Sequence, residues 1–126
     1  MNIINTIYLS ELELKTFTEQ DALDYCQLNS INYSDITELY LRNNELTDIS
    51  GIKLFKNLKD LNLAYNKIKD ISVLKKLKEL SINNNQIKDI SVIQYLTDLK
   101  ILYLNGNRIS NISVLNQFNK NIKIIK

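Results

Sequence analysis

The sequence predicts an α/β repeat solenoid, with short parallel strands on one side of a stack of coils and short helical or extended segments on the other. Asn recurs at four places, and each closes nearly the same phrase: LYLRNNEL, LNLAYNKI, LSINNNQI and LYLNGNRI. Each phrase is followed at a fixed distance by DIS or NIS. Aliphatic residues also recur at fixed places around these phrases. A sequence period of about 20–50 residues is typical of stacked coils.

Five positions in each unit are always aliphatic. All 20 are Leu or Ile, although these residues make up only 39 of the 126 in the chain. The positions are Leu39, Leu41, Leu46, Ile49 and Ile52; Leu61, Leu63, Ile68, Ile71 and Leu74; Leu80, Ile82, Ile87, Ile90 and Ile93; Leu102, Leu104, Ile109, Ile112 and Leu115. The first two alternate with polar residues, which predicts a strand with one buried face. The last three are spaced by three, which suits a turn of tight helix behind the strand.

The recurring polar residues are interpreted as structural. An Asn side chain carries two donor hydrogens and an acceptor oxygen, and a buried polar group must be paired. Asn44, Asn66, Asn85 and Asn107 are therefore predicted to form a ladder that bonds the backbone of adjacent coils. A short polar side chain before each convex segment would cap its free amides, and a Ser that forms the turn follows two residues later. These pairs are Asp48 with Ser50, Asp70 with Ser72, Asp89 with Ser91, and Asn111 with Ser113.

The units resemble the leucine-rich repeat, LxxLxLxxNxIxDIxxL. Their length and the DIS element are most similar to the subclass found in bacterial internalins and in phosphatase-regulatory proteins of eukaryotes. The resemblance covers about residues 36–126. It implies parallel strands on the concave side, short helical or extended segments on the convex side, and a role as an interaction scaffold, since most leucine-rich repeats have that role.

The repeat array is expected to occupy residues 36–126, as units 36–57, 58–76, 77–98 and 99–120 with a terminal strand at 121–126. The second unit is three residues short, because the Asn spacings are 22, 19 and 22. The shortfall lies in its second half, which predicts a tighter convex turn and a local change of curvature. Ile122, Ile124 and Ile125 form the terminal strand with no helical cap after it, and self-association through this uncovered edge is one hypothesis.

Residues 1–35 fit no repeat unit and are expected to be an N-terminal cap, a strand plus a helix, over the apolar end of the first coil. The segment from Thr18 to Asp21 predicts a capping box that opens a helix ending at Leu28. Leu12, Leu14 and Phe17 alternate with polar residues, which suggests that the strand lies there. Cys26 is interpreted as a buried small apolar residue. This region carries six acids and one Lys, so a partner site of its own is the functional alternative.

The amino-acid composition argues against several classes of function. The chain has no His and a single Cys, and it contains no Gly-rich phosphate loop, metal-ligand cluster or nucleophile next to a base. We therefore expect no enzyme, no cofactor and no metal site. Glu38, Asp60 and Glu79 form a column that could hold a cation weakly, but a solvated edge is the simpler interpretation. No signal peptide or membrane span is evident, which favours a cytoplasmic protein without membrane partners.

The residues that point outward from the strands predict the binding face. Both Arg of the chain and three of its seven Tyr fall there, and these residue types are enriched in interface hot spots. The predicted partner-binding residues are Tyr40, Arg42, Tyr65, Lys67, Tyr103, Asn105 and Arg108. Acids line one edge of the face, with Glu45, Lys67, Gln86 and Arg108 along the other, so a partner of mixed charge fits better than a uniformly anionic one.

The sequence thus favours a non-catalytic module that binds a protein on its concave face, as a regulator, adaptor or inhibitor of an enzyme. The alternative is nucleic-acid binding through the basic array, since residues 36–126 carry eight acids and 15 bases. The Lys residues at scattered offsets and the acidic concave edge argue against that alternative.

Overall fold

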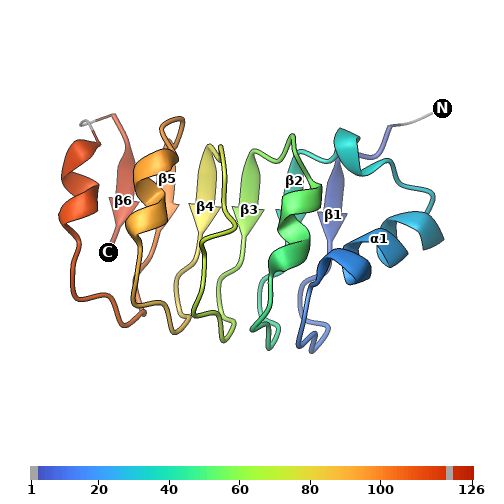
Figure 1. The fold of residues 1–126 in the computed structure, drawn as a ribbon, viewed down its shortest axis with the longest axis horizontal. Helices are drawn as coiled ribbons and strands as arrows, with labels where there is room; N and C mark the ends of the chain where they lie inside the picture. The colour runs from blue at the N-terminus through green and yellow to red at the C-terminus, as the bar shows by residue number, and fades with distance from the viewer. Residues whose placement is uncertain (1–2, 119–120) are drawn as a thin grey trace.

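Six parallel strands form one sheet in strict sequence order, from β1 to β6 (Figure 1). The computed structural model describes residues 3–118 and 121–126. The strands are β1 (Thr6–Tyr8), β2 (Glu38–Tyr40), β3 (Asp60–Asn62), β4 (Glu79–Ser81), β5 (Ile101–Tyr103) and β6 (Lys123–Ile125). A parallel sheet without crossovers between distant strands requires one coil per strand, which confirms the predicted solenoid.

A second layer of short helices covers the convex side of the sheet (Figure 1). It contains the α-helix α1 (Glu19–Leu28) and four short 3₁₀ helices: η1 (Tyr33–Asp35), η2 (Ser50–Leu54), η3 (Ser91–Tyr95) and η4 (Ser113–Gln117). Asp48, Asp89 and Asn111 each accept a hydrogen bond from the amide of the serine at the start of η2, η3 and η4, over 2.8–3.0 Å. The predicted tight turns and their polar caps are therefore present.

The second coil has no convex helix. Between β3 and β4 the chain makes a turn in which the amide of Leu74 donates to the carbonyl of Ile71 over 3.1 Å. Lys76 then adopts a left-handed conformation with φ of +46°. Leu77 is buried at the position that Leu58 and Leu99 take in the neighbouring coils. The three missing residues are thus lost between Leu74 and Leu77, after the first turn that this coil shares with η2, and the tighter turn is confirmed.

The core is the stack of aliphatic side chains between the two layers. Of the 20 predicted positions, 18 are buried. The exceptions are Ile109, which is half-buried, and Ile112, which is 43% exposed. Both belong to the fourth coil, and in the described part of the chain only β6 continues beyond it. An aliphatic position in a solenoid is buried by the next coil, so these two keep an open side.

The first strand lies at Thr6–Tyr8, so the prediction of a strand around Leu12, Leu14 and Phe17 was wrong. Pairing in register places Ile7 beside Leu39 and Tyr8 beside Tyr40. By the same spacing Leu9, Leu14 and Phe17 take the positions of Leu41, Leu46 and Ile49. Residues 6–17 therefore form an additional coil of the repeat, which the sequence interpretation missed.

Helix α1 begins as predicted. The amide of Asp21 donates to the hydroxyl of Thr18 over 3.1 Å, and the amide of Thr18 donates to the Asp21 carboxylate over 2.9 Å, which completes the capping box. The buried side of the helix carries Ala22 and Cys26, and it packs against η2. Burial raises the pKa of the Cys26 thiol, as expected for a cysteine inside an apolar interface.

Candidate concave binding site

The Asn ladder sets the register of the whole concave surface. The side-chain amide of Asn66 donates to the carbonyls of Leu41 and Leu63 over 3.0 Å each, and its oxygen accepts from the amide of Leu46 over 3.0 Å. Asn44, Asn85 and Asn107 repeat the arrangement, with partners both in their own coil and in the coil before. Each Asn thus fastens its coil to the preceding one, which fixes the positions of the outward side chains.

The turn after each strand holds one residue in the left-handed conformation. The equivalent residues are Glu11, Asn43, Tyr65, Asn84 and Gly106, with φ between 59° and 73°. The amides of the first four extend the ladder between coils, as Tyr65 does by donating to the carbonyl of Asn83 over 3.0 Å. Asn and Gly tolerate this conformation, whereas an aromatic residue is strained there. Tyr65 is therefore held in a costly backbone geometry at the concave face.

Tyr8 and Tyr40 form a stacked aromatic pair on β1 and β2. Their ring centroids lie 5.1 Å apart with an interplanar angle of 6°. The Tyr40 hydroxyl donates to Glu38 Oε2 over 3.4 Å, and the same oxygen accepts from the Thr6 hydroxyl over 3.1 Å. Burial, followed by the nearby Glu38 carboxylate, raises the pKa of Tyr40 and keeps its hydroxyl a donor. The pair presents an aromatic surface, since Tyr8 is 71% exposed.

Tyr8 was missed in the sequence analysis, although a signal was present. Ile7 and Leu9 flank it with the same alternation as Leu39 and Leu41 around Tyr40. The additional coil at residues 6–17 lacks the Asn by which the other units were aligned, because Leu12 takes that position.

Arg42 lies over the ring of Tyr65, with its guanidinium carbon 5.0 Å from the ring centroid. Both side chains are exposed, and they come from neighbouring coils. A cation–π contact of this kind holds the guanidinium in place while leaving its donors free for a partner carboxylate. The predicted residues Tyr40, Arg42 and Tyr65 thus form, with Tyr8, two pairs on neighbouring coils of the concave face, which together we call the N-terminal concave cluster.

Tyr103 stands apart from this cluster. Register places Tyr8, Tyr40, Asn62, Ser81, Tyr103 and Ile125 in a single column across the sheet. Three strand spacings separate Tyr40 from Tyr103, or about 14 Å. The ammonium of Lys123 lies 5.9 Å from the centroid of the Tyr103 ring. The column therefore offers two aromatic contact points with the small polar side chains of Asn62 and Ser81 between them.

The remaining predicted residues lie along the turn edge of the face. Lys67 is exposed and forms an ion pair with Glu45 over 3.6 Å, a type of surface pair that contributes at most about 1 kcal/mol. Arg108 is exposed, and Asn105 is half-buried with its carbonyl accepting from the amide of Asn84 over 2.8 Å. These three do not contact the N-terminal concave cluster in the described contacts, so they stay predictions as partner contacts.

Acids line the opposite edge of the face. Glu38, Asp60 and Glu79 occupy matching positions on β2, β3 and β4. Burial, together with the Glu38 carboxylate, raises the pKa of Asp60. Among residues 3–118 and 121–126, no group of three or more acidic, Cys or His side chains is arranged to hold a metal ion. The described helices include none that is long and apolar enough to cross a membrane.

Comparison with known proteins places this geometry in context. The family model for leucine-rich repeats (2 copies) matches residues 35–76 and again 75–117. A search of curated protein sequences finds no match. Among solved structures, a crystal structure of an internalin (inlF) from Listeria monocytogenes superposes with a TM-score of 0.66 and 38% identity. That alignment covers 77% of this chain and 32% of the internalin chain, so this chain spans about a third of that structure.

A crystal structure of an internalin C2 (inlC2) from the same organism is also similar. It superposes with a TM-score of 0.58 and 22% identity, and the alignment covers 98% of this chain and 80% of the internalin chain. At this identity the likeness concerns the fold alone.

Proposed function

Because this chain belongs to the leucine-rich repeat family, we propose that it is a non-catalytic module that binds a protein partner on its concave face. Leucine-rich repeats generally mediate protein interactions, and the fold supplies a regular sheet face for that purpose. One observation carries the proposal: the N-terminal concave cluster combines a stacked tyrosine pair with an arginine held over a third tyrosine. Tyr and Arg are the residues that most often carry interface binding energy.

The side chains of the concave face indicate which residue types a partner would present to it. The exposed tyrosines would pack against apolar side chains, and the Arg42 guanidinium would bind a carboxylate with two parallel hydrogen bonds. The acidic edge at Glu38, Asp60 and Glu79 would attract basic residues. We infer a partner segment that places an acidic group beside β2 and β3, with basic groups along the opposite edge. A regulator or inhibitor of an enzyme is one form that such a module would take.

The test is affinity capture with the purified chain, followed by binding kinetics on the captured partner. The variant Tyr40→Ala, Tyr103→Ala removes both aromatic contact points and is expected to weaken binding by about a hundredfold. The control is Tyr33→Ala, which makes the same chemical change at an exposed tyrosine outside the concave face. Equal binding by the concave variant and the wild type would contradict the proposal.

Two other sequence hypotheses stay predictions. Self-association through the β6 edge predicts dimers that light scattering detects at high micromolar concentration, and a monomer there would contradict it. Nucleic-acid binding predicts steep salt-dependent binding to an oligonucleotide. The cytoplasmic location is likewise a proposal, which fractionation of the source cells would test.

A further inference from the structure

The convex layer is interrupted at the second coil. Helix α1 packs against η2 on one side of the interruption, and η3 packs against η4 on the other. Residues 70–78 between them contain no helix, and Figure 1 shows only a loop in front of β3 and β4. We call this interruption the convex gap. It arises from the three residues by which the second unit is short.

Two clefts open in the convex gap, one on each side of the turn at Lys75 and Lys76. The first lies between η2 and the turn, has a volume of about 270 Å³, and includes Phe55, Val73 and Leu77 in its lining. The second lies between the turn and η3, has a volume of about 560 Å³, and includes Val92 and Tyr95. Tyr95 is 70% exposed, although it is large and apolar over most of its surface. The gap therefore leaves Val73, Val92 and Tyr95 accessible between two helices, whereas Phe55 and Leu77 are buried at the floor of the first cleft.

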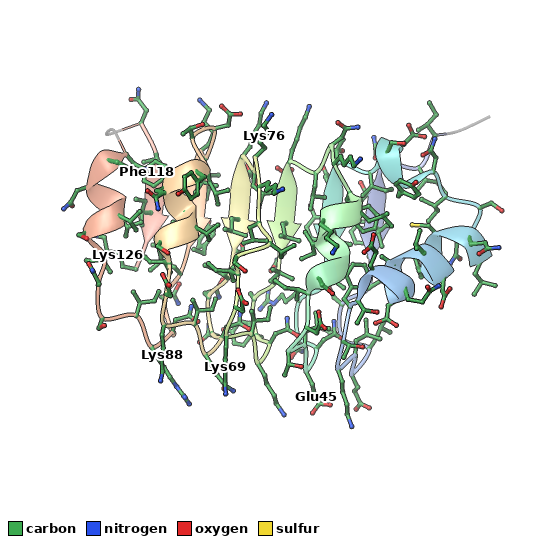
Figure 2. The ribbon with its side chains drawn as sticks, in the orientation of Figure 1. Glu45, Lys69, Lys76, Lys88, Phe118 and Lys126 are labelled. Carbon is green, nitrogen blue, oxygen red and sulfur yellow. The ribbon has the colours of Figure 1, made fainter. Side chains whose placement is uncertain are left out.

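Lysines surround these apolar side chains. Lys53, Lys56, Lys75 and Lys76 are all exposed, and all of them line the clefts. None of the residues that line either cleft is acidic. Figure 2 shows Lys76 near the upper edge of the molecule, away from Lys69 and Lys88 at the lower edge. A ligand that fits both features would combine apolar side chains with carboxylates.

Helix α1 shows within this chain how η2 accepts such a ligand. It is acidic in its first turn and brings the buried side of Ala22 and Cys26 against η2. Its Glu19 carboxylate lies 3.4 Å from the Lys53 ammonium. The side of η2 that faces the convex gap offers the same combination of apolar surface and lysines, but no segment of the described chain occupies it.

We propose that the convex gap binds an acidic amphipathic helix of a partner protein, which completes the helical layer between η2 and η3. The partner helix places its apolar side chains in the two clefts and its carboxylates beside Lys56, Lys75 and Lys76. This second site lies on the face opposite the concave site, so the chain is able to hold two partners at once.

The probe is a fluorescein-labelled helical peptide of about 15 residues, with Leu on one face and Glu on both flanks of that face. Fluorescence anisotropy at physiological salt is expected to show saturable binding. The variant Lys75→Glu, Lys76→Glu is expected to weaken it by about tenfold or more. Tyr95→Ser, at an exposed position where the fold does not depend on the ring, is expected to weaken it by about threefold.

Matched controls separate this site from general charge attraction. The variant Lys69→Glu, Lys88→Glu makes the same change in net charge at the opposite edge and is expected to bind within about twofold of the wild type. The concave variant Tyr40→Ala, Tyr103→Ala is expected to bind equally well. Circular dichroism confirms that each variant is folded, and amide chemical-shift changes are expected to centre on Val73, Val92 and Tyr95.

Three results would overturn the proposal. One is an absence of saturable binding by the wild type. Another is an equal loss of binding in both double lysine variants, which would indicate attraction by net charge alone. The third is tighter binding of a single-stranded oligonucleotide than of the peptide with the same dependence on Lys75 and Lys76, which would identify the gap as a nucleic-acid site.

Discussion

Arg42 lies over the ring of Tyr65 at 5.0 Å, and Tyr65 is an aromatic residue in the left-handed backbone conformation. Tyr65 has φ of 59°, a conformation that the equivalent coils assign to Glu11, Asn43, Asn84 and Gly106. The coil of residues 58–76 therefore has a strained backbone at Tyr65, the residue that orients Arg42. Strain retained next to exposed binding groups is typical of functional sites.

The first prediction concerns this pair. In an Arg42→Ala background, Tyr65→Asn is expected to raise the free energy of unfolding by about 1 kcal/mol, because Asn relieves the left-handed strain. With Arg42 present the gain is expected to be smaller by about 0.5–1 kcal/mol, which is the strength of an exposed cation–π contact. Urea unfolding of the four proteins measures both quantities. The reverse exchange, Asn43→Tyr in the first full unit, serves as the control and should be destabilising.

The Asn ladder predicts a gradient of stability along the chain. Asn66→Ala leaves the fully buried amide of Leu46 without its acceptor and is expected to cost about 3 kcal/mol. Asn107→Ala is expected to cost about 1 kcal/mol, because Asn107 is half-buried and water reaches its partners. Urea midpoints compare the two. Equal losses of stability in the two variants would show that the burial of the ladder Asn does not produce this gradient.

Gly51 fixes how α1 packs. A Cβ at this position would contact the carbonyl oxygen of Thr18 and would lie 2.7 Å from that of Phe17, and both are backbone atoms that cannot rotate away. Gly51→Ala is expected to cost about 1–3 kcal/mol and to expose the amides of α1 to faster hydrogen exchange.

Gly106→Asn provides the comparison for Gly51. Its φ of 73° suits Asn, and the nearest obstacle is the mobile side chain of Asn84. It is expected to cost less than Gly51→Ala and to leave the hydrogen exchange of α1 unchanged. Faster exchange in α1 in this variant would show that the effect at Gly51 is not local.

Three aspartates predict the response to acid. Hydrogen bonds from the serine two residues later hold the pKa of Asp48, Asp70 and Asp89 below the ordinary value of 3.8. The Ser50 and Ser91 amides are the main cause for Asp48 and Asp89, and the Ser72 hydroxyl is the main cause for Asp70. A depressed pKa in the folded state stabilises the fold above the unfolded value. That contribution disappears as the pH falls through the folded values.

Asn is a suitable replacement for these three aspartates. In the fourth coil Asn111 accepts the same hydrogen bond from the Ser113 amide over 3.0 Å, and its side chain does not titrate. We expect the triple variant Asp48→Asn, Asp70→Asn, Asp89→Asn to lose less stability than the wild type between about pH 5 and about pH 3. Asp60, whose burial raises its pKa, acts in the opposite direction and is unchanged in both proteins. Parallel acid-unfolding curves would contradict this assignment.

Much of the fold followed from the sequence because each coil repeats the same environment. Leu39 and Leu41 predicted their counterparts in every unit, and the missing residues before Leu77 predicted the tight turn. Ile109 and Ile112 were the exceptions, since their exposure depends on what lies beyond the fourth coil, which no property of either residue encodes.

The additional coil at residues 6–17 could not be predicted from the sequence for a physical reason. The ladder Asn serves the backbone of the preceding coil, and among residues 3–118 and 121–126 no strand precedes β1, so Leu12 has no described coil to bond. Without that Asn the register of residues 6–17 was hidden, and Tyr8 was overlooked with it. The stacking of Tyr8 on Tyr40 and the contact of Arg42 with Tyr65 depend on rotamers across strands, which column positions do not specify.

The direction of the Asn ladder has a consequence for how the chain acquires its structure. Asn44 donates to the carbonyl of Leu9 and accepts from the amides of Leu12 and Leu14, all of which lie earlier in the chain. Asn66, Asn85 and Asn107 also bond to the coil before their own. During synthesis, each coil that leaves the ribosome brings the Asn side chain that forms hydrogen bonds to the backbone of the coil before it. Ordered structure can therefore accumulate from the N-terminus as the chain emerges, with no need to wait for the C-terminal end.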